Sequence, residues 1–280
     1  MLADVDVARF ADAGFVVLRN VFDPAPLSHE VDRALNEGLT SRPGTGGDAF
    51  RYLPMMCERT PESLALLDTL ARPAAQLLGR PVIPLRGKGT RYSGATAWHR
   101  DSEVDVDSIG CVAYLEPLRA GTGALRVVPG SHRDPSLGES LAEAIETVPG
   151  DVIAFDEHLL HASFGGVGRR QWRVDFLADP DAAEVARLRG YLATIFDPAW
   201  DSGYDAGRYP SYGAAWLRWP RPWVERLREL GVYTLAAAQE AAAAVRAHPE
   251  PPRLEKAGLV ASDPADAALL CSRSRRPQPR

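Results

Sequence analysis

His99 and Asp101 stand two residues apart in the stretch Thr96–Asp101. In an extended strand this spacing directs both side chains to the same face. A further histidine, His161, follows much later in the chain. Two histidines and one carboxylate are the ligand set that holds a non-heme Fe(II) while leaving its other coordination positions open. The three residues therefore predict an iron site.

The overall composition is that of an ordinary globular protein. The chain has 280 residues, of which 45% are hydrophobic and 25% charged, and its formal net charge is −5. This acidic balance, with no basic stripe before the C-terminal tail, argues against a nucleic-acid partner. No apolar run approaches a membrane span, and the N-terminus lacks the layout of a signal peptide. We expect a small-molecule substrate and neither nucleic acid nor membrane as partner; the oligomeric state is not indicated.

Cysteine usage bears on the compartment. The three cysteines, Cys57, Cys111 and Cys271, are far apart and odd in number. They suggest neither a disulfide framework nor a zinc cluster. A reducing cytoplasm fits this pattern and would also suit Fe(II).

The first 80 residues are predicted to be mainly helical. Helices are expected at 6–13, 24–39 and 61–78, the last with Thr60 as its N-cap, and a strand at 15–19. Residues 40–58 are expected to form a loop near the mouth of a site. From residue 81 the pattern changes to short strands at 82–86, 90–99, 109–116, 124–128, 151–155 and 171–177. Their connections are too short for repeated βαβ units, so a jelly roll is expected: mostly β with flanking helices, and room for an internal metal.

The chain becomes helical again after residue 180. Helices are expected at 181–192 and 222–246. We expect one jelly-roll domain over 1–190, a helical extension over 191–270 packed on that core, and a disordered tail over 271–280.

Several motifs occur in a characteristic order. They are the opening segment 14–22, the His99-x-Asp101 pair, the Pro-Gly-Ser-His turn at 129–132, and the segment 149–155 that leads to His161-x-Ser163. With these motifs the chain resembles the phytanoyl-CoA dioxygenase family of Fe(II)- and 2-oxoglutarate-dependent oxygenases, whose fold is a double-stranded β-helix. The resemblance covers about residues 7–180 and implies Fe(II), 2-oxoglutarate and O₂ as cofactors and co-substrates. It also implies His99, Asp101 and His161 as metal ligands; His158 competes with His161, which is preferred for its trailing x-Ser.

The resemblance further implies an arginine after the distal histidine that binds the far carboxylate of 2-oxoglutarate. Spacing from His161 favours Arg170. Strand alternation puts Arg169, Gln171 and Arg173 on one face, and Arg169 is favoured instead if that polar face points into the barrel. We take Arg170 first and keep Arg169.

Residues on the strands before His99 are expected to line the pocket. Lys88 is a further residue for cofactor binding. Arg86, Arg91, Tyr92 and His158 are expected in the substrate pocket. No catalytic residue beyond the metal ligands is expected.

The resemblance implies an oxidation reaction that releases succinate and CO₂. Related halogenases replace the carboxylate ligand by a small residue, whereas this chain retains Asp101. We therefore expect a hydroxylase, or an enzyme of a related desaturation or ring closure, that acts on a small molecule of secondary metabolism. The alternatives are a non-catalytic jelly-roll binding protein and a cupin-type isomerase or epimerase that uses a metal.

Overall fold

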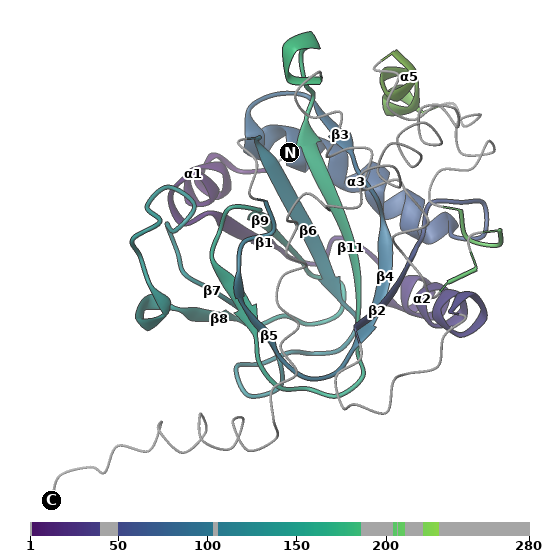
Figure 1. The fold of residues 1–280 in the computed structure, drawn as a ribbon, viewed down its shortest axis with the longest axis horizontal. Coiled ribbons are helices and arrows are strands. Elements are labelled where there is room, and N and C mark those ends of the chain that lie inside the picture. Colours follow the sequence, from purple (N-terminus) through teal and green to yellow (C-terminus); the bar gives the residue numbers. More distant parts are fainter. Residues whose placement is uncertain are drawn as a thin grey trace, which may run out of the picture.

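The computed structural model describes residues 2–39, 50–102, 106–185, 204–205, 207–210 and 221–229. Its centre is a pair of antiparallel β-sheets (Figure 1). The larger sheet has seven strands: β1 (Phe15–Leu18), β2 (Phe50–Pro54), β3 (Val82–Pro84), β4 (Lys88–Tyr92), β6 (Ser108–Tyr114), β9 (Val152–Asp156) and β11 (Arg169–Ala178). The smaller sheet has four: β5 (Thr96–His99), β7 (Leu125–Val127), β8 (Glu143–Ile145) and β10 (His161–Ser163). The expected mostly-β architecture with flanking helices is confirmed.

The strand order explains how distant segments meet. The larger sheet runs β1-β9-β6-β11-β4-β2, with β3 also paired to β11, and the smaller sheet runs β5-β10-β7-β8. The single strand expected at 90–99 is wrong: the chain turns at residues 93–95 and places β4 and β5 in different sheets. The expectation of a loop over 40–58 is also wrong for β2, and the short strands β8 and β10 are absent from the sequence prediction. Strands this short are held by pairing with neighbours rather than by a sequence pattern of their own.

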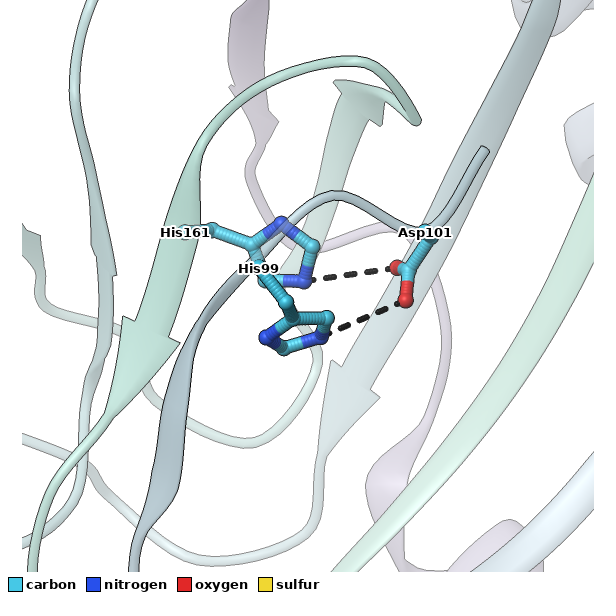
Figure 2. A group of neighbouring side chains, drawn as sticks. All are labelled: His99, Asp101 and His161. Atoms are coloured by element: carbon cyan, nitrogen blue, oxygen red, sulfur yellow. Dashed lines mark ion pairs between the residues drawn. The ribbon is translucent and has the colours of Figure 1, made fainter. Parts of the chain in front are cut away.

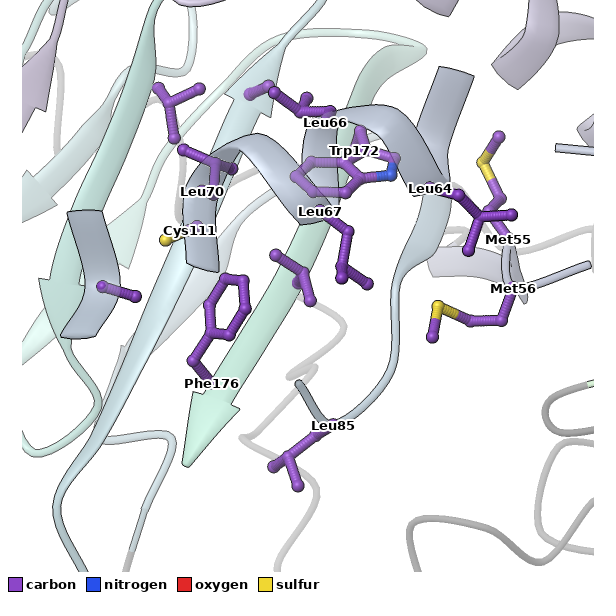
Figure 3. Close-up of a cluster of buried hydrophobic side chains, with 14 of the residues drawn as sticks. Met55, Met56, Leu64, Leu66, Leu67, Leu70, Leu85, Cys111, Trp172 and Phe176 are labelled. Atoms are coloured by element: carbon purple, nitrogen blue, oxygen red, sulfur yellow. The ribbon is translucent and has the colours of Figure 1, made fainter. Parts of the chain in front are cut away.

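Three helices lie against the outer face of the larger sheet (Figure 1). They are α1 (Asp4–Ala13), α2 (Pro24–Gly38) and α3 (Pro61–Leu78). The apolar stripe of α3 packs on Trp172 and Phe176 of β11, both fully buried (Figure 3). The indole Nε1 of Trp172 donates to Ser63 Oγ at 2.6 Å, so the largest side chain of this core has no unsatisfied donor.

The helix ends show one confirmed and one wrong expectation. Asp23 accepts a hydrogen bond from the Ala25 N–H and so starts α2 as expected. Thr60 does not cap α3, because its hydroxyl is engaged with the backbone of Cys57. The buried carboxylate of Glu30 on α2 takes over that role and accepts the N–H groups of residues 62 and 63 at 3.0 and 2.8 Å.

A second core fills the space between the two sheets. Tyr114 and Phe155 of the larger sheet pack there with Leu125 and Val127 of the smaller one. In the middle of β11 the side chains alternate, so Trp172, Val174 and Phe176 face the helices while Arg173 and Asp175 face this interior.

The C-terminal part is described only in pieces. The helix α5 (Pro222–Glu229) is tied to the core by Arg226, whose Nε donates to Asp179 at 2.8 Å. Residues 182–185 begin the helix expected at 181–192. The rest of that helix, the remainder of 222–246 and the tail 271–280 lie outside the described residues, and the domain boundaries stay predictions. Within the described part, no helix has the length and apolar character to cross a membrane.

Candidate metal centre

The two histidines are brought together by strand pairing. His99 ends β5, His161 begins β10, and the two residues are direct partners in the antiparallel register. Their ring centroids lie 4.1 Å apart. The smaller sheet thus juxtaposes residues that are far apart in sequence.

Asp101 completes the group from just beyond the strand (Figure 2). Its Oδ1 lies 3.4 Å from His99 Nε2, and its Oδ2 lies 3.3 Å from His161 Nε2. The ligand atoms of the three residues all lie within 4.8 Å of one another. Strand alternation does not explain why Asp101 lies beside His99, because β5 ends at His99. The backbone after the strand is instead held by a hydrogen bond of 2.9 Å from the Asp101 N–H to the Glu157 carbonyl.

Both imidazoles are oriented by their own backbone. His99 Nδ1 lies 2.7 Å from the Ala97 carbonyl, and His161 Nδ1 lies 2.9 Å from the Leu159 carbonyl. A carbonyl oxygen only accepts, so each Nδ1 donates to the backbone and each Nε2 points toward Asp101. Two imidazoles whose Nε2 atoms converge on a carboxylate fit a divalent metal ion.

The Pro-Gly-Ser-His turn supports this arrangement. The buried Ser131 Oγ accepts the Leu160 N–H at 2.8 Å, directly before His161. Arg100, between the two ligands of the His-x-Asp pair, donates from Nε to the His158 carbonyl at 2.8 Å. The turn therefore fixes the backbone on both sides of the site.

A buried arginine lies behind the carboxylate. Arg173 on β11 contacts Asp101 Oδ2 at 2.8 Å through NH1 and Glu157 Oε1 at 2.8 Å through NH2. Its Nε lies 2.5 Å from Asp175 Oδ1, and Lys88 Nζ lies 3.3 Å from Asp175 Oδ2. The sequence analysis places Arg173 on the same strand face as Arg169 but does not predict its contact with Asp101. That shared polar face is the one feature of the sequence that could have pointed to Arg173.

Burial and charge act oppositely on these acids. Burial raises the pKa of Asp101, but Arg173 and then His161 outweigh it and hold that pKa well below its usual value. Burial also raises the pKa of Asp175, but the positive charges of Arg173 and Lys88 outweigh it, so the pKa of Asp175 is lowered overall. For Glu157 burial prevails and, with Asp175 nearby, raises its pKa to about 8 despite Arg173. Burial therefore favours the neutral form of Glu157, whereas Arg173 favours the ionised forms of Asp101 and Asp175.

Arg169 lies on the interior face at the start of β11. It is buried, and its guanidinium stacks 3.8 Å from the centroid of the Tyr92 ring. NH1 donates to the Gly123 carbonyl at 2.6 Å and to Ser163 Oγ, and NH2 donates to the Gly94 carbonyl at 2.8 Å. Its buried Nε has no hydrogen-bond partner, and no carboxylate pairs with it among the described residues. A buried guanidinium with free N–H groups and no counter-ion suits a carboxylate ligand.

Arg170 points the other way, toward helix α2. Its Nε contacts Glu116 Oε1 and its NH1 contacts Asp32 Oδ2, both at 2.5 Å. Arg91, its neighbour across the ladder, lies on the same side and contacts Asp32 Oδ1 at 3.1 Å. These two arginines join the sheet to α2 and do not face the histidines.

The remaining expected site residues lie in three different surroundings. Lys88 and Tyr92 lie on the interior face, where they contact Asp175 and Arg169. Arg86 lies 5.4 Å from the centroid of the Tyr52 ring. His158 stays outside the triad, with Nδ1 3.0 Å from Asp156 Oδ1.

The two sheets, with a histidine pair and a carboxylate between them, form a double-stranded β-helix of the cupin and jelly-roll class. The chain belongs to the phytanoyl-CoA dioxygenase family, whose model matches residues 10–173. This confirms the expected family and places the chain among the Fe(II)- and 2-oxoglutarate-dependent oxygenases, which take Fe(II), 2-oxoglutarate and O₂.

Solved structures show the same fold. The 2-oxoglutarate-dependent epimerase SnoN from nogalamycin biosynthesis is 21% identical, with a TM-score of 0.55 over 63% of this chain and 82% of its own. AviO1 from Streptomyces viridochromogenes Tue57 is 23% identical, with a TM-score of 0.52 over 64% of this chain and 96% of AviO1. EctD from S. alaskensis is 22% identical, with a TM-score of 0.52 over 64% of this chain and 78% of EctD. A comparison with curated protein sequences finds no match.

Proposed function

We propose that the protein is a hydroxylase that oxidises a small molecule of secondary metabolism, with 2-oxoglutarate converted to succinate and CO₂. The observation that carries this proposal is a two-histidine, one-carboxylate group and a buried arginine without a counter-ion among the described residues, all facing the same interior.

His99, Asp101 and His161 are the proposed metal ligands. Their ligand atoms lie within 4.8 Å of one another, and the Nε2 atoms of both imidazoles point toward Asp101, which supports binding of one ion by all three. Bound Fe(II) would supply the O₂ chemistry, with three protein ligands leaving open positions. The chain's own part is to orient those ligands and to keep bulk water out of the interior.

Arg169 is the proposed anchor for the far carboxylate of 2-oxoglutarate. Arg169 lies four residues before Arg173 on the same strand face, which separates the two positions by roughly 13 Å along β11. Arg173 contacts Asp101, so Arg169 is displaced along the strand from the metal ligands. Spacing from His161 favours Arg170, but the two ion pairs of Arg170 with Glu116 and Asp32 on the helix side favour Arg169 instead. Tyr92 would support the anchor by stacking, whereas Lys88, already paired with Asp175, lies nearer the metal ligands.

The reaction class and substrate rest on less specific support. The retained Asp101 favours oxygen transfer over halogen transfer. SnoN is an epimerase, but 21% identity supports a common fold and not a common reaction. A non-catalytic role is disfavoured, because a binding protein has no need for two imidazoles oriented toward a carboxylate together with a buried arginine that has no counter-ion among the described residues. Arg86 stays a proposed substrate contact, and a cytoplasmic location stays a prediction, supported by the buried free thiols of Cys57 and Cys111.

The test is turnover of 2-oxoglutarate without added substrate. The protein is loaded with Fe(II) anaerobically, given 2-oxoglutarate and then O₂, and succinate is measured. We expect slow succinate formation and, before O₂ is added, a visible charge-transfer band that requires both Fe(II) and 2-oxoglutarate.

The matched variants are His161→Ala and His158→Ala. The first should abolish the band and succinate formation, while the second, outside the triad, should keep both. Absence of succinate and of the band in the unsubstituted protein would refute the oxygenase function. If His158→Ala lost the band and succinate formation while His161→Ala kept both, the assignment of His161 as a metal ligand would be refuted, but the oxygenase function would not.

A further inference from the structure

The guanidinium of Arg173 is shared by three acids. Each of its nitrogens faces a different carboxyl group: NH1 faces Asp101, NH2 faces Glu157 and Nε faces Asp175. The side chains of Arg173 and Glu157 are 12% and 4% exposed, so this contact is made away from bulk water. An arginine that only balanced the charge of the metal ligand would not need all three nitrogens in this way.

The fold makes room for this side chain. On the neighbouring strand β6, a Cβ at Gly110 would lie 3.1 Å from Arg173 NH2 and 2.9 Å from Phe155 Cζ. The guanidinium carbon lies 5.3 Å from the centroid of the Phe155 ring. A side chain at position 110 would therefore press on the Phe155 ring and on NH2 of Arg173, so these groups would have to shift.

Two acidic residues besides Asp101, Glu157 and Asp175, lie next to the proposed metal site. Glu157 is connected to Asp101 twice: its carbonyl accepts the Asp101 N–H at 2.9 Å, and its carboxyl group shares Arg173 with the Asp101 carboxylate. Asp175 is held by Arg173 and Lys88 together. A divalent ion binds carboxylate oxygens readily, so a Glu157 or Asp175 carboxylate released from Arg173, which they share with Asp101, would be a competing ligand.

The carboxylate of Asp101 has three charged or polar neighbours. Oδ1 faces His99 Nε2 at 3.4 Å, while Oδ2 lies 2.8 Å from Arg173 NH1 and 3.3 Å from His161 Nε2. Oδ2 is buried, and Arg173 is the nearer of its two neighbours.

We propose that Arg173 is a positioning residue that keeps coordination positions open: it occupies Oδ2 of Asp101, so that this ligand binds through Oδ1, and it holds Glu157 and Asp175 away from the metal. The proposal rests on the proposed metal site and adds the reason why only three protein groups bind there. Two adjacent open positions are what a chelating keto acid requires, so Arg173 acts on 2-oxoglutarate binding through the metal ligands rather than by contact.

The experiment compares Arg173→Gln with Arg170→Gln. Both residues lie on β11 and each contacts more than one acid, but Arg170 faces α2. Calorimetry with Ni(II) measures metal affinity, an anaerobic titration of the Fe(II) band measures 2-oxoglutarate affinity, and thermal unfolding of the Ni(II)-loaded proteins checks folding.

Arg173→Gln is expected to keep Ni(II) binding but to weaken 2-oxoglutarate binding roughly tenfold or more, the scale found for partners of metal ligands. The visible spectrum of the Co(II)-loaded variant should show the lower intensity of a higher coordination number. Adding Glu157→Gln to Arg173→Gln should recover most of the lost 2-oxoglutarate affinity, which a purely structural defect would not do. Arg170→Gln should leave both affinities unchanged within about twofold.

Wild-type 2-oxoglutarate affinity in Arg173→Gln, or no recovery in the double variant, would overturn the proposal. If Arg173→Gln does not fold, Arg173→Lys replaces it, because the donors of an ammonium all sit on one nitrogen and do not reproduce the planar spread of the guanidinium nitrogens over three acids, and the same weakening and recovery are expected. A wild-type protein that binds neither Ni(II) nor 2-oxoglutarate would instead refute the proposed function.

Discussion

Replacing Arg169 by glutamine should weaken the binding of 2-oxoglutarate by about tenfold to a hundredfold. A guanidinium has five N–H groups, and Arg169 donates to three acceptors in the protein, which leaves Nε and one further N–H for a ligand. A charge-assisted pair contributes roughly 1.5–3 kcal/mol, and each 1.4 kcal/mol changes affinity about tenfold.

The same substitution removes donors from buried acceptors. The carbonyls of Gly94 and Gly123 and the hydroxyl of Ser163 lose their guanidinium contacts, so the free energy of unfolding should fall by about 1–3 kcal/mol. Thermal unfolding therefore accompanies every titration, and affinities are compared only among folded proteins.

The assay is an anaerobic titration of 2-oxoglutarate into the Fe(II)-loaded protein, followed by its charge-transfer band. Arg170→Gln is the matched control on the neighbouring residue, and its affinity should stay near that of the wild type. If Arg170→Gln weakens binding strongly and Arg169→Gln does not, the argument from strand face is wrong and the argument from spacing is right.

Three further outcomes concern the scaffold. The buried Asp151 has its pKa lowered because backbone N–H groups and Arg19 outweigh the effect of burial; its stabilisation is complete above about pH 4 and is lost as the pH falls further. Urea unfolding of Asp151→Asn should show lower stability at pH 7, but a smaller loss between pH 5 and pH 3 than the wild type shows. Glu30→Ala should lower the free energy of unfolding by about 1–2 kcal/mol through the lost contacts at the start of α3, and an unchanged melting temperature would contradict that role. Trp172→Phe should cost about 1–3 kcal/mol by losing the bond to Ser63, which denaturant titration can measure.

The class of fold, the family and the three residues of the proposed metal site can all be predicted from the sequence alone. Short strands with turns between them indicate an antiparallel two-sheet architecture, because alternation and turn chemistry are local properties of the chain. The ligand types at His99, Asp101 and His161 likewise limit the chemistry, because the donor atoms of a side chain set which metals it binds well.

Tertiary structure decided which face of β11 points inward. Alternation separates Arg169 from Arg170 but does not tell which of the two faces the interior; the helices against Trp172 decide it by burying the apolar face. Thr60 fails as a cap for a similar reason, since the acceptor at the start of α3 comes from Glu30 on another helix.

Tertiary structure also assembled the surroundings of the metal group. His99 and His161 meet through the register of β5 and β10, and Asp101 is positioned by a carbonyl of Glu157 after its own strand has ended. Arg173, Glu157 and Asp175 become one charged cluster only when β11 and the end of β9 lie on either side of β6. Residue types are local, but contacts between distant strands depend on register and packing, and these belong to the folded chain as a whole.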